Sequence, residues 1–219
     1  MKLSLPGLRP AAGLLRIPLF PLRTVLFPGG LLPLKVFEQR YIAMTKACLA
    51  EGRPFGVCLI TRGDEVARPG APEPPEFATI GTLARITAWD MPQLGILHVA
   101  AEGTTRFKVE SHRVEASGLV VAEAIALAAE PSVAVDAAHA PLARLLELAA
   151  ARLGAHRFPA QPAYDDASWV GYRLAELLPL PLPIKQSMLE VNDAAVRLAV
   201  IARFLADQGV LQREGSGTS

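Results

Sequence analysis

Net charge, clustered lysine and cysteine are all scarce in this sequence of 219 residues. Its 22 basic residues nearly cancel its 21 acidic ones, and its few lysines are scattered along the chain. A phosphate backbone or an anionic membrane surface would meet no strong attractive field, which disfavours nucleic acid and membranes as partners. Two cysteines are too few for a disulfide framework, and they fit a reducing cytoplasm.

Long apolar runs are also missing. A membrane-spanning helix needs roughly 20 apolar residues, whereas Arg197 and Arg203 interrupt the longest apolar helical stretch of this chain. Near the start, Pro6, Gly7 and Pro10 break any signal-peptide core. We therefore expect a cytoplasmic protein. Its apolar fraction of 51% is nevertheless large enough to build substantial cores.

Short β-type runs separated by proline and glycine fill residues 14–130. The runs are 17–20, 31–37, 55–60, 82–89, 95–100, 105–111 and 118–127. One helix interrupts them, because apolar residues recur at helical spacing over 38–52 and Gly52 is placed to end the helix. The proline-rich and charged segment 62–77 predicts an exposed loop.

Helical patterns replace the strands after Pro131. An apolar stripe runs from Leu142 to Leu153, with Asp136 as its candidate cap. A second helix is predicted to begin near Asp165 and Asp166, and a short one covers 184–190. The last helix is expected to start after Asn192 and to stop at Gly209.

This order of elements, strands first and helices second, predicts an α+β fold and excludes alternating βαβ units. We expect a β-rich subdomain over 14–130, a helical subdomain over 131–209, and a disordered tail over 210–219.

The stretch IPLFPLRTVLFPGGLLPLKVFEQRY at 17–41 resembles the opening of Lon protease N-terminal (substrate-binding) domains. Three later stretches, at 55–60, 80–86 and 178–198, agree with the same family in the same order. The resemblance covers about residues 14–207. It implies a PUA-like β-rich pseudobarrel with one inserted helix, followed by a C-terminal helical bundle.

In Lon proteases this region precedes the ATPase and peptidase domains and helps to recognise substrate polypeptides. Because the chain ends where those domains would begin, the resemblance implies a stand-alone Lon-domain protein. We expect a non-catalytic module that binds unfolded polypeptide or a partner protein. RNA binding is the alternative, since PUA-like folds elsewhere hold RNA, but it would need a basic face with stacking aromatics.

Catalytic motifs are absent. No GxxxxGK[ST] stretch occurs that could hold phosphates, and the turn at 27–30 is better explained as a simple turn between strands. Ser187 and Lys185 stand two positions apart on a predicted helix, so their side chains cannot meet as a Ser-Lys dyad. His98 and His112 lie on predicted neighbouring strands, but nothing nearby completes a zinc ligand set. We expect no metal and no cofactor.

Two groups of residues are candidates for binding. Phe27 precedes Pro28 and two glycines, where a large ring is not easily buried, so we expect it to form an exposed apolar patch with Leu26 and Leu31. The second group is Glu38, Arg40 and Tyr41, within the stretch that most resembles the family. Its alternative explanation places Glu38 at a helix N-terminus and leaves Arg40 solvated.

We predict that the pure protein hydrolyses neither ATP nor casein, because both the phosphate-holding turn and the Ser-Lys pair are missing. Phosphate release and casein cleavage would be measured with the wild-type chain. Turnover that a point substitution within this chain abolished would contradict the prediction.

Overall fold

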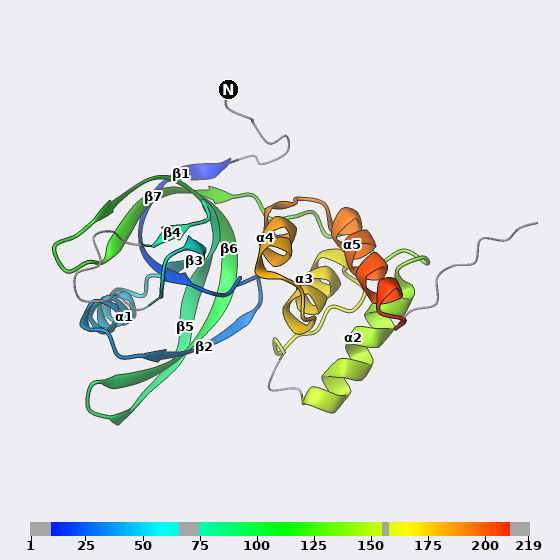
Figure 1. The fold of residues 1–219 in the computed structure, drawn as a ribbon, viewed down its shortest axis with the longest axis horizontal. Helices are drawn as coiled ribbons and strands as arrows, with labels where there is room; N and C mark the ends of the chain where they lie inside the picture. Colours follow the sequence, from blue (N-terminus) through cyan, green and yellow to red (C-terminus); the bar gives the residue numbers. More distant parts are fainter. Residues whose placement is uncertain (1–9, 66–74, 155–157, 211–219) are drawn as a thin grey trace, which may run out of the picture. The chain divides into compact units, whose positions relative to one another are not determined.

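The computed structural model describes residues 10–65, 75–154 and 158–210 (Figure 1). Most of the loop predicted at 62–77, and all but the first residue of the tail predicted at 210–219, lie outside the described residues. The chain divides into two compact units. The first comprises Met1–Ala129 and Leu180–Glu190, and the second comprises Glu130–Pro179 and Val191–Ser219.

A closed sheet forms the first unit. Its strands follow the order β1-β7-β6-β5-β3, and β1 also pairs with β3, in parallel, so that the sheet closes into a barrel. These strands are β1 (Pro10–Leu22), β3 (Phe55–Arg62), β5 (Ile80–Gln93), β6 (Ile96–Val114) and β7 (Val120–Leu127). Two further strands join its sides: β2 (Leu31–Val36) pairs with β6, and β4 (Glu76–Phe77) pairs with β3. The predicted α+β fold with a β-rich pseudobarrel is confirmed.

The strand β6 replaces two predicted strands. The sequence suggested a break between 95–100 and 105–111, around Gly103, but the strand continues through this glycine. A Cβ atom at Gly103 would lie 2.3 Å from the carbonyl oxygen of Phe27. The glycine therefore marks a close approach of two backbones. Our prediction of two separate strands was wrong because a glycine in a strand pattern resembles a turn signal.

The turn at 27–30 is bonded to the middle of β6. Gly29 donates its N–H to the Gly103 carbonyl at 2.7 Å, and Gly103 donates to the Gly30 carbonyl at 2.8 Å. The Gly30 N–H donates to the Phe27 carbonyl at 2.9 Å, which closes the turn itself. Because these bonds hold the turn against the barrel, Phe27 has 0% of its surface exposed and Leu26 is also buried. The expectation of an exposed Phe27 and Leu26 was wrong.

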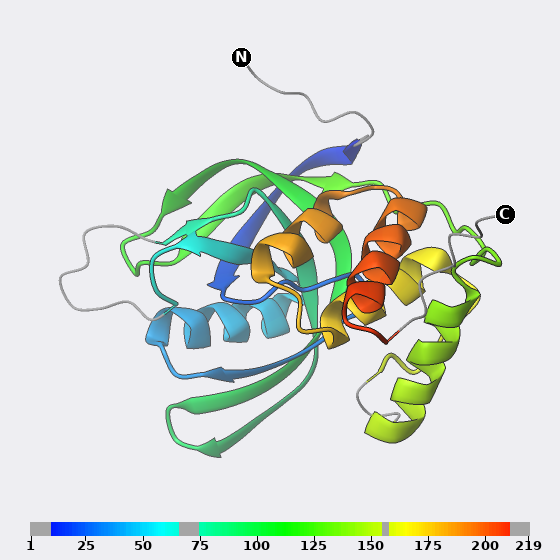
Figure 2. The same cartoon turned by 45° about the vertical axis from the view of Figure 1, so that its right-hand side comes forward.

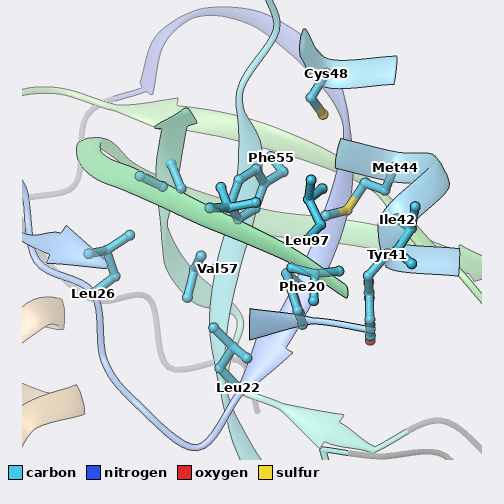
Figure 3. Packing of buried hydrophobic residues seen from close by; sticks show 14 residues of the cluster. Phe20, Leu22, Leu26, Tyr41, Ile42, Met44, Cys48, Phe55, Val57 and Leu97 are labelled. Atoms are coloured by element: carbon cyan, nitrogen blue, oxygen red, sulfur yellow. The ribbon is translucent and has the colours of Figure 1, made fainter. Parts of the chain in front are cut away.

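The helix α1 (Gln39–Glu51) supplies one wall of the main core and lies between the barrel and β2 (Figure 2). Gly52 ends it in the left-handed conformation, as predicted, with φ of 62°. Figure 3 shows Tyr41, Ile42 and Met44 pointing from α1 toward barrel residues. The rings of Tyr41 and Phe20 stack with centroids 4.0 Å apart.

The helix α4 (Leu182–Glu190) belongs to the first unit, although the sequence places it in the helical half. Arg106, buried on β6, donates to the Leu189 carbonyl at 2.9 Å. Gln186 donates from Nε2 to the Ile80 carbonyl at 3.0 Å. Helical periodicity identifies a helix but not the surface it packs on, so this assignment could not be made from the pattern.

The second unit contains α2 (Ala140–Leu153), α3 (Ala167–Leu177) and α5 (Ala194–Asp207). The helix α3 begins after Asp166, where its start was predicted, and Asp166 caps it by accepting from the N–H of Trp169 at 2.7 Å. Two other predicted caps were wrong by a few residues. Asp193 caps α5 in place of Asn192, and α2 begins after His139, beyond Asp136. Asp136 instead accepts from the His139 N–H at 2.9 Å, in the turn before α2.

A buried ion pair lies inside the second unit. Arg197 donates to Glu130 through both terminal nitrogens, at 2.5 and 3.0 Å, and its guanidinium lies 4.0 Å above the Tyr172 ring. Ser168 donates a further hydrogen bond to the same carboxylate at 2.7 Å. Burial by itself would raise the pKa of Glu130. The hydrogen bonds and charge of Arg197, together with the hydrogen bonds of Ser168 and Tyr172, hold this pKa below its usual value.

We predict that Glu130→Gln lowers the free energy of unfolding by about 3 to 5 kcal/mol, because it leaves the buried Arg197 charge uncompensated. In the wild type the lowered pKa should contribute stability that is fully present above the ordinary glutamate pKa of about 4.3. That contribution should be lost as the pH falls through the folded-state value. Urea unfolding at several pH values measures both effects. An unchanged stability in the variant would count against the pair.

We predict that Phe27→Ala lowers the free energy of unfolding by about 3 to 5 kcal/mol, because truncating a fully buried ring leaves a cavity. The matched control is Phe37→Ala, since the Phe37 side chain is 51% exposed and its loss should cost little. Equal destabilisation by the two substitutions in urea unfolding would show that the burial of Phe27 is not what matters.

Candidate binding surface

Three strands run side by side where the β5–β6 hairpin extends past the barrel (Figures 1 and 2). The first part of β6 lies between β2 and β5, so that residues form rows across the ribbon. One row is Pro33, Ala100 and Ala88, and the next is Lys35, His98 and Asp90. Side chains alternate between the two faces of a strand. These two rows therefore share the face opposite to the buried Leu97, Val99 and Ala101.

Small side chains leave a hollow on this outer face. It has a volume of about 570 Å³ and an almost wholly apolar lining. We call it the outer hollow, and it is lined by Pro33, Leu34, Lys35, Ala88, Trp89, Asp90, His98, Val99 and Ala100. The shape follows from a strand pattern in which short residues of three strands share one row.

A second, smaller hollow borders the other side of β2. Its volume is about 180 Å³, and we call it the inner hollow. It is lined by Phe20, Leu22, Pro33, Leu34, Lys35, Val36, Phe37, Glu38, Tyr41 and Glu65. The two hollows share the β2 residues 33–35. This short stretch of one strand therefore borders both depressions.

Large apolar side chains are exposed around the same strands. Trp89 of the outer hollow is 57% exposed, and Phe37 of the inner hollow is exposed to a similar degree. Leu31 at the start of β2 is exposed, and Leu94 in the β5–β6 turn has 94% of its surface exposed. Apolar side chains gathered in this way beside a depression are typical of a surface that binds another molecule.

The second predicted group, Glu38, Arg40 and Tyr41, is brought together at the start of α1. Arg40 pairs with Glu38 at 2.9 Å, donates to the Gly118 carbonyl at 2.9 Å, and lies 4.5 Å above the Tyr41 ring. Its side chain is only 11% exposed, so the expectation of a solvated Arg40 was wrong. The carboxylate of Glu38 makes no cap hydrogen bond, because it is turned toward the guanidinium.

Tyr41 is not an acid–base group. Burial raises its pKa to about 12, against the opposing effect of the Arg40 charge. The phenol is therefore neutral at physiological pH. Of the predicted group, Glu38 and Tyr41 line the inner hollow. Arg40 does not line it but contacts both residues, through its ion pair with Glu38 and its stacking over the Tyr41 ring.

Groups suited to catalysis or metal binding do not converge in the part of the chain that the structure describes. No set of three His, Cys, Asp or Glu side chains there could hold a metal. His98 and His112 lie on the same strand, so the prediction that placed them on neighbouring strands was wrong. Burial raises the pKa of the Cys58 thiol to about 12 and also raises that of Cys48, so neither is a ready nucleophile.

The Ser187 hydroxyl donates to the Pro183 carbonyl one turn back along α4, at 3.0 Å. Among the described helices, none combines the length and the apolar character that crossing a membrane requires.

The outer hollow was missed at the sequence level. Its one strong signal is Trp89, a large aromatic residue a few positions before the turn at Leu94 and Gly95. Pro33, Ala88 and Ala100 come from three strands and carry no motif, so only the strand register brings them into one row. Of the first predicted group, Leu31 alone is exposed.

This chain is similar to the N-terminal part of Lon proteases. The family model for the substrate-binding domain of ATP-dependent protease La (LON) matches residues 16–207. Lon protease 2 of Myxococcus xanthus is 30% identical over 201 residues, which are 86% of this chain and 23% of that protein. Lon protease of Phenylobacterium zucineum is 29% identical over 198 residues, 86% of this chain and 24% of that protein. The chain thus spans about a quarter of the length of these relatives.

Solved structures agree with the fold. A Lon N-terminal domain protein from Xanthomonas campestris has a TM-score of 0.67 and 36% sequence identity, covering 88% of this chain and 98% of that one. The N-terminal domain of Mycobacterium avium complex Lon protease has a TM-score of 0.55 at 15% identity, with the same coverages. The second likeness concerns the fold alone.

Proposed function

We propose that this chain, which belongs to the family of Lon substrate-binding domains, is a non-catalytic module that binds polypeptide segments through the outer and inner hollows. The observation that carries the proposal is the outer hollow, an apolar depression of about 570 Å³ beside the exposed ring of Trp89. Its volume accommodates apolar side chains of a bound segment.

The chemistry of this surface supports polypeptide as its ligand. The hollow offers apolar contact and no converging acid, base and nucleophile. Lys35 and His98 are its basic residues and Asp90 is its acidic one, so its rim is close to balanced. A phosphate-bearing ligand would want a concentrated positive charge, whereas an unfolded protein segment offers the exposed leucine and aromatic side chains that such a hollow removes from water.

In this proposal the predicted binding residues take three different roles: at the surface, as a positioning residue, and in the core. Leu31 remains at the edge of the surface, and Glu38 and Tyr41 contribute to the inner hollow. Arg40 is a positioning residue, because its contacts orient Glu38 and Tyr41. Leu26 and Phe27 are assigned to the core. The buried free thiols of Cys48 and Cys58 fit a reducing compartment, so we propose the cytoplasm as the location.

We predict that Trp89→Ala weakens capture of a permanently unfolded model protein by about thirtyfold, because an aromatic anchor contributes on the order of 2 kcal/mol. Fluorescence anisotropy of a labelled, reduced and carboxymethylated protein measures the affinity. The melting temperature should stay near the wild-type value, since the ring is largely exposed.

The matched control is Val114→Ala, which removes an exposed apolar side chain from the far end of β6. It should bind as the wild type does. Equal affinities for wild type and Trp89→Ala would place binding elsewhere on the chain. A steep loss of affinity with added salt would instead favour the RNA alternative, because counterion release dominates that kind of binding.

A further inference from the structure

The strand β2 has one unused edge. It pairs with β6 alone, and among the described residues none bonds the backbone of Leu31, Pro33 or Lys35 outside that ladder. In an antiparallel pair, alternate residues direct their N–H and C=O groups toward the partner strand. Pro33 has no N–H, and proline in a strand places its nitrogen on the side away from the ladder. The backbone hydrogen bonds to β6 are therefore formed by Leu32, Leu34 and Val36.

The residues left for the edge are Leu31, Pro33 and Lys35. Each presents a carbonyl oxygen, and Leu31 and Lys35 also present an N–H group. An exposed edge of this kind is a template for a further strand. Because Pro33 lacks a donor, an added strand can form paired donor and acceptor bonds at Leu31 and at Lys35 but not at Pro33.

We propose that a polypeptide segment in extended conformation adds to this edge of β2, pairing with the backbone at Lys35 and placing alternate side chains in the outer and inner hollows. The proposal rests on the proposed function and specifies how the same surface binds. The two hollows lie on either side of the β2 residues 33–35. Successive side chains of an added strand point to opposite faces and so enter the two hollows in turn.

Charge identifies the segment further. Lys35 is exposed on the edge strand, and its ammonium group has no ion pair within the described part of the chain. The next residue in its row is His98, and Asp90 stands one strand beyond that. A residue of the added strand directly opposite Lys35 lies on the same face, where a carboxylate is favoured. The segment is therefore apolar at alternating positions, with an acidic residue facing Lys35.

A second copy of the chain is a poorer occupant. Two-fold pairing of β2 with itself about Pro33 would leave facing carbonyls without donors, because proline has no N–H. Pairing about Lys35 would set two ammonium groups opposite each other. Registers centred on Leu32 or Leu34 avoid both juxtapositions, but they place no carboxylate opposite Lys35, which a foreign segment is free to supply.

The test uses two labelled nonapeptides of identical sequence, with valine or leucine at alternating positions and a central glutamate. One carries an N-methyl group on the glutamate nitrogen and the other on the next residue. Strand addition uses the main-chain groups of alternate residues only. We therefore expect one isomer to bind the full chain about tenfold more weakly than the other, since it loses a backbone hydrogen bond. Fluorescence anisotropy gives both affinities.

A protein variant tests the same bond from the other side. Lys35→Pro removes the one N–H group that an added strand needs in the centre of the edge, and it should weaken the unmethylated peptide about tenfold. Lys35→Glu should weaken the glutamate peptide and strengthen one with a central lysine. Lys46→Glu, an exposed change on α1, is the control and should alter neither affinity.

The outcomes separate the mode of binding from the proposed function. One outcome is that the two methylated isomers bind with equal affinity while Trp89→Ala still weakens binding of the unfolded protein. That result would overturn strand addition and leave the proposed function in place. If the wild type bound no peptide and no unfolded protein, both would fail. A dimer that Lys35→Pro abolished, without peptide binding, would assign the edge to a second copy and overturn the proposal.

Discussion

The close approach of two backbones at Gly103 is the constraint on which the rest of the first unit depends. The turn at 27–30 can reach β6 only because no Cβ stands between the Phe27 carbonyl and the strand. The pair of hydrogen bonds from this turn fixes where β2 begins, and therefore which residues of β2 and β6 stand opposite each other. A shift of one residue would turn every β2 side chain to the other face. The rows that shape both hollows follow from this one contact.

Local patterns in the sequence predicted what local physics determines. Gly52 ends α1 because it adopts a left-handed conformation, and Asp166 caps α3 because its carboxylate reaches an unpaired N–H. The order of strands and helices, with the family resemblance, gave the α+β fold. What failed depends on distant partners. Phe27 is buried because β6 draws its turn inward, and nothing within the turn itself reveals that strand.

The candidate surface shows the same division. Glu38 and Tyr41, which were chosen because they lie within the continuous stretch that resembles the family, line the inner hollow, whereas Leu31, which was chosen for its place beside an apolar turn, is exposed at the start of β2. The outer hollow could not be predicted from the sequence, because the short residues of three strands become neighbours only through the strand register. Arg40 was misjudged because the Gly118 carbonyl that it binds lies 78 positions away in the chain.

The membership of α4 in the first unit has a consequence for how the protein is made. This helix provides the Leu189 carbonyl for the buried Arg106 guanidinium, yet it lies more than 50 residues beyond Ala129, where the strands have ended. A ribosome therefore synthesises most of the second unit before it delivers the segment that completes the first. The first unit is therefore complete only after most of the second has been synthesised, so the two units cannot finish folding strictly one after the other in the order of synthesis.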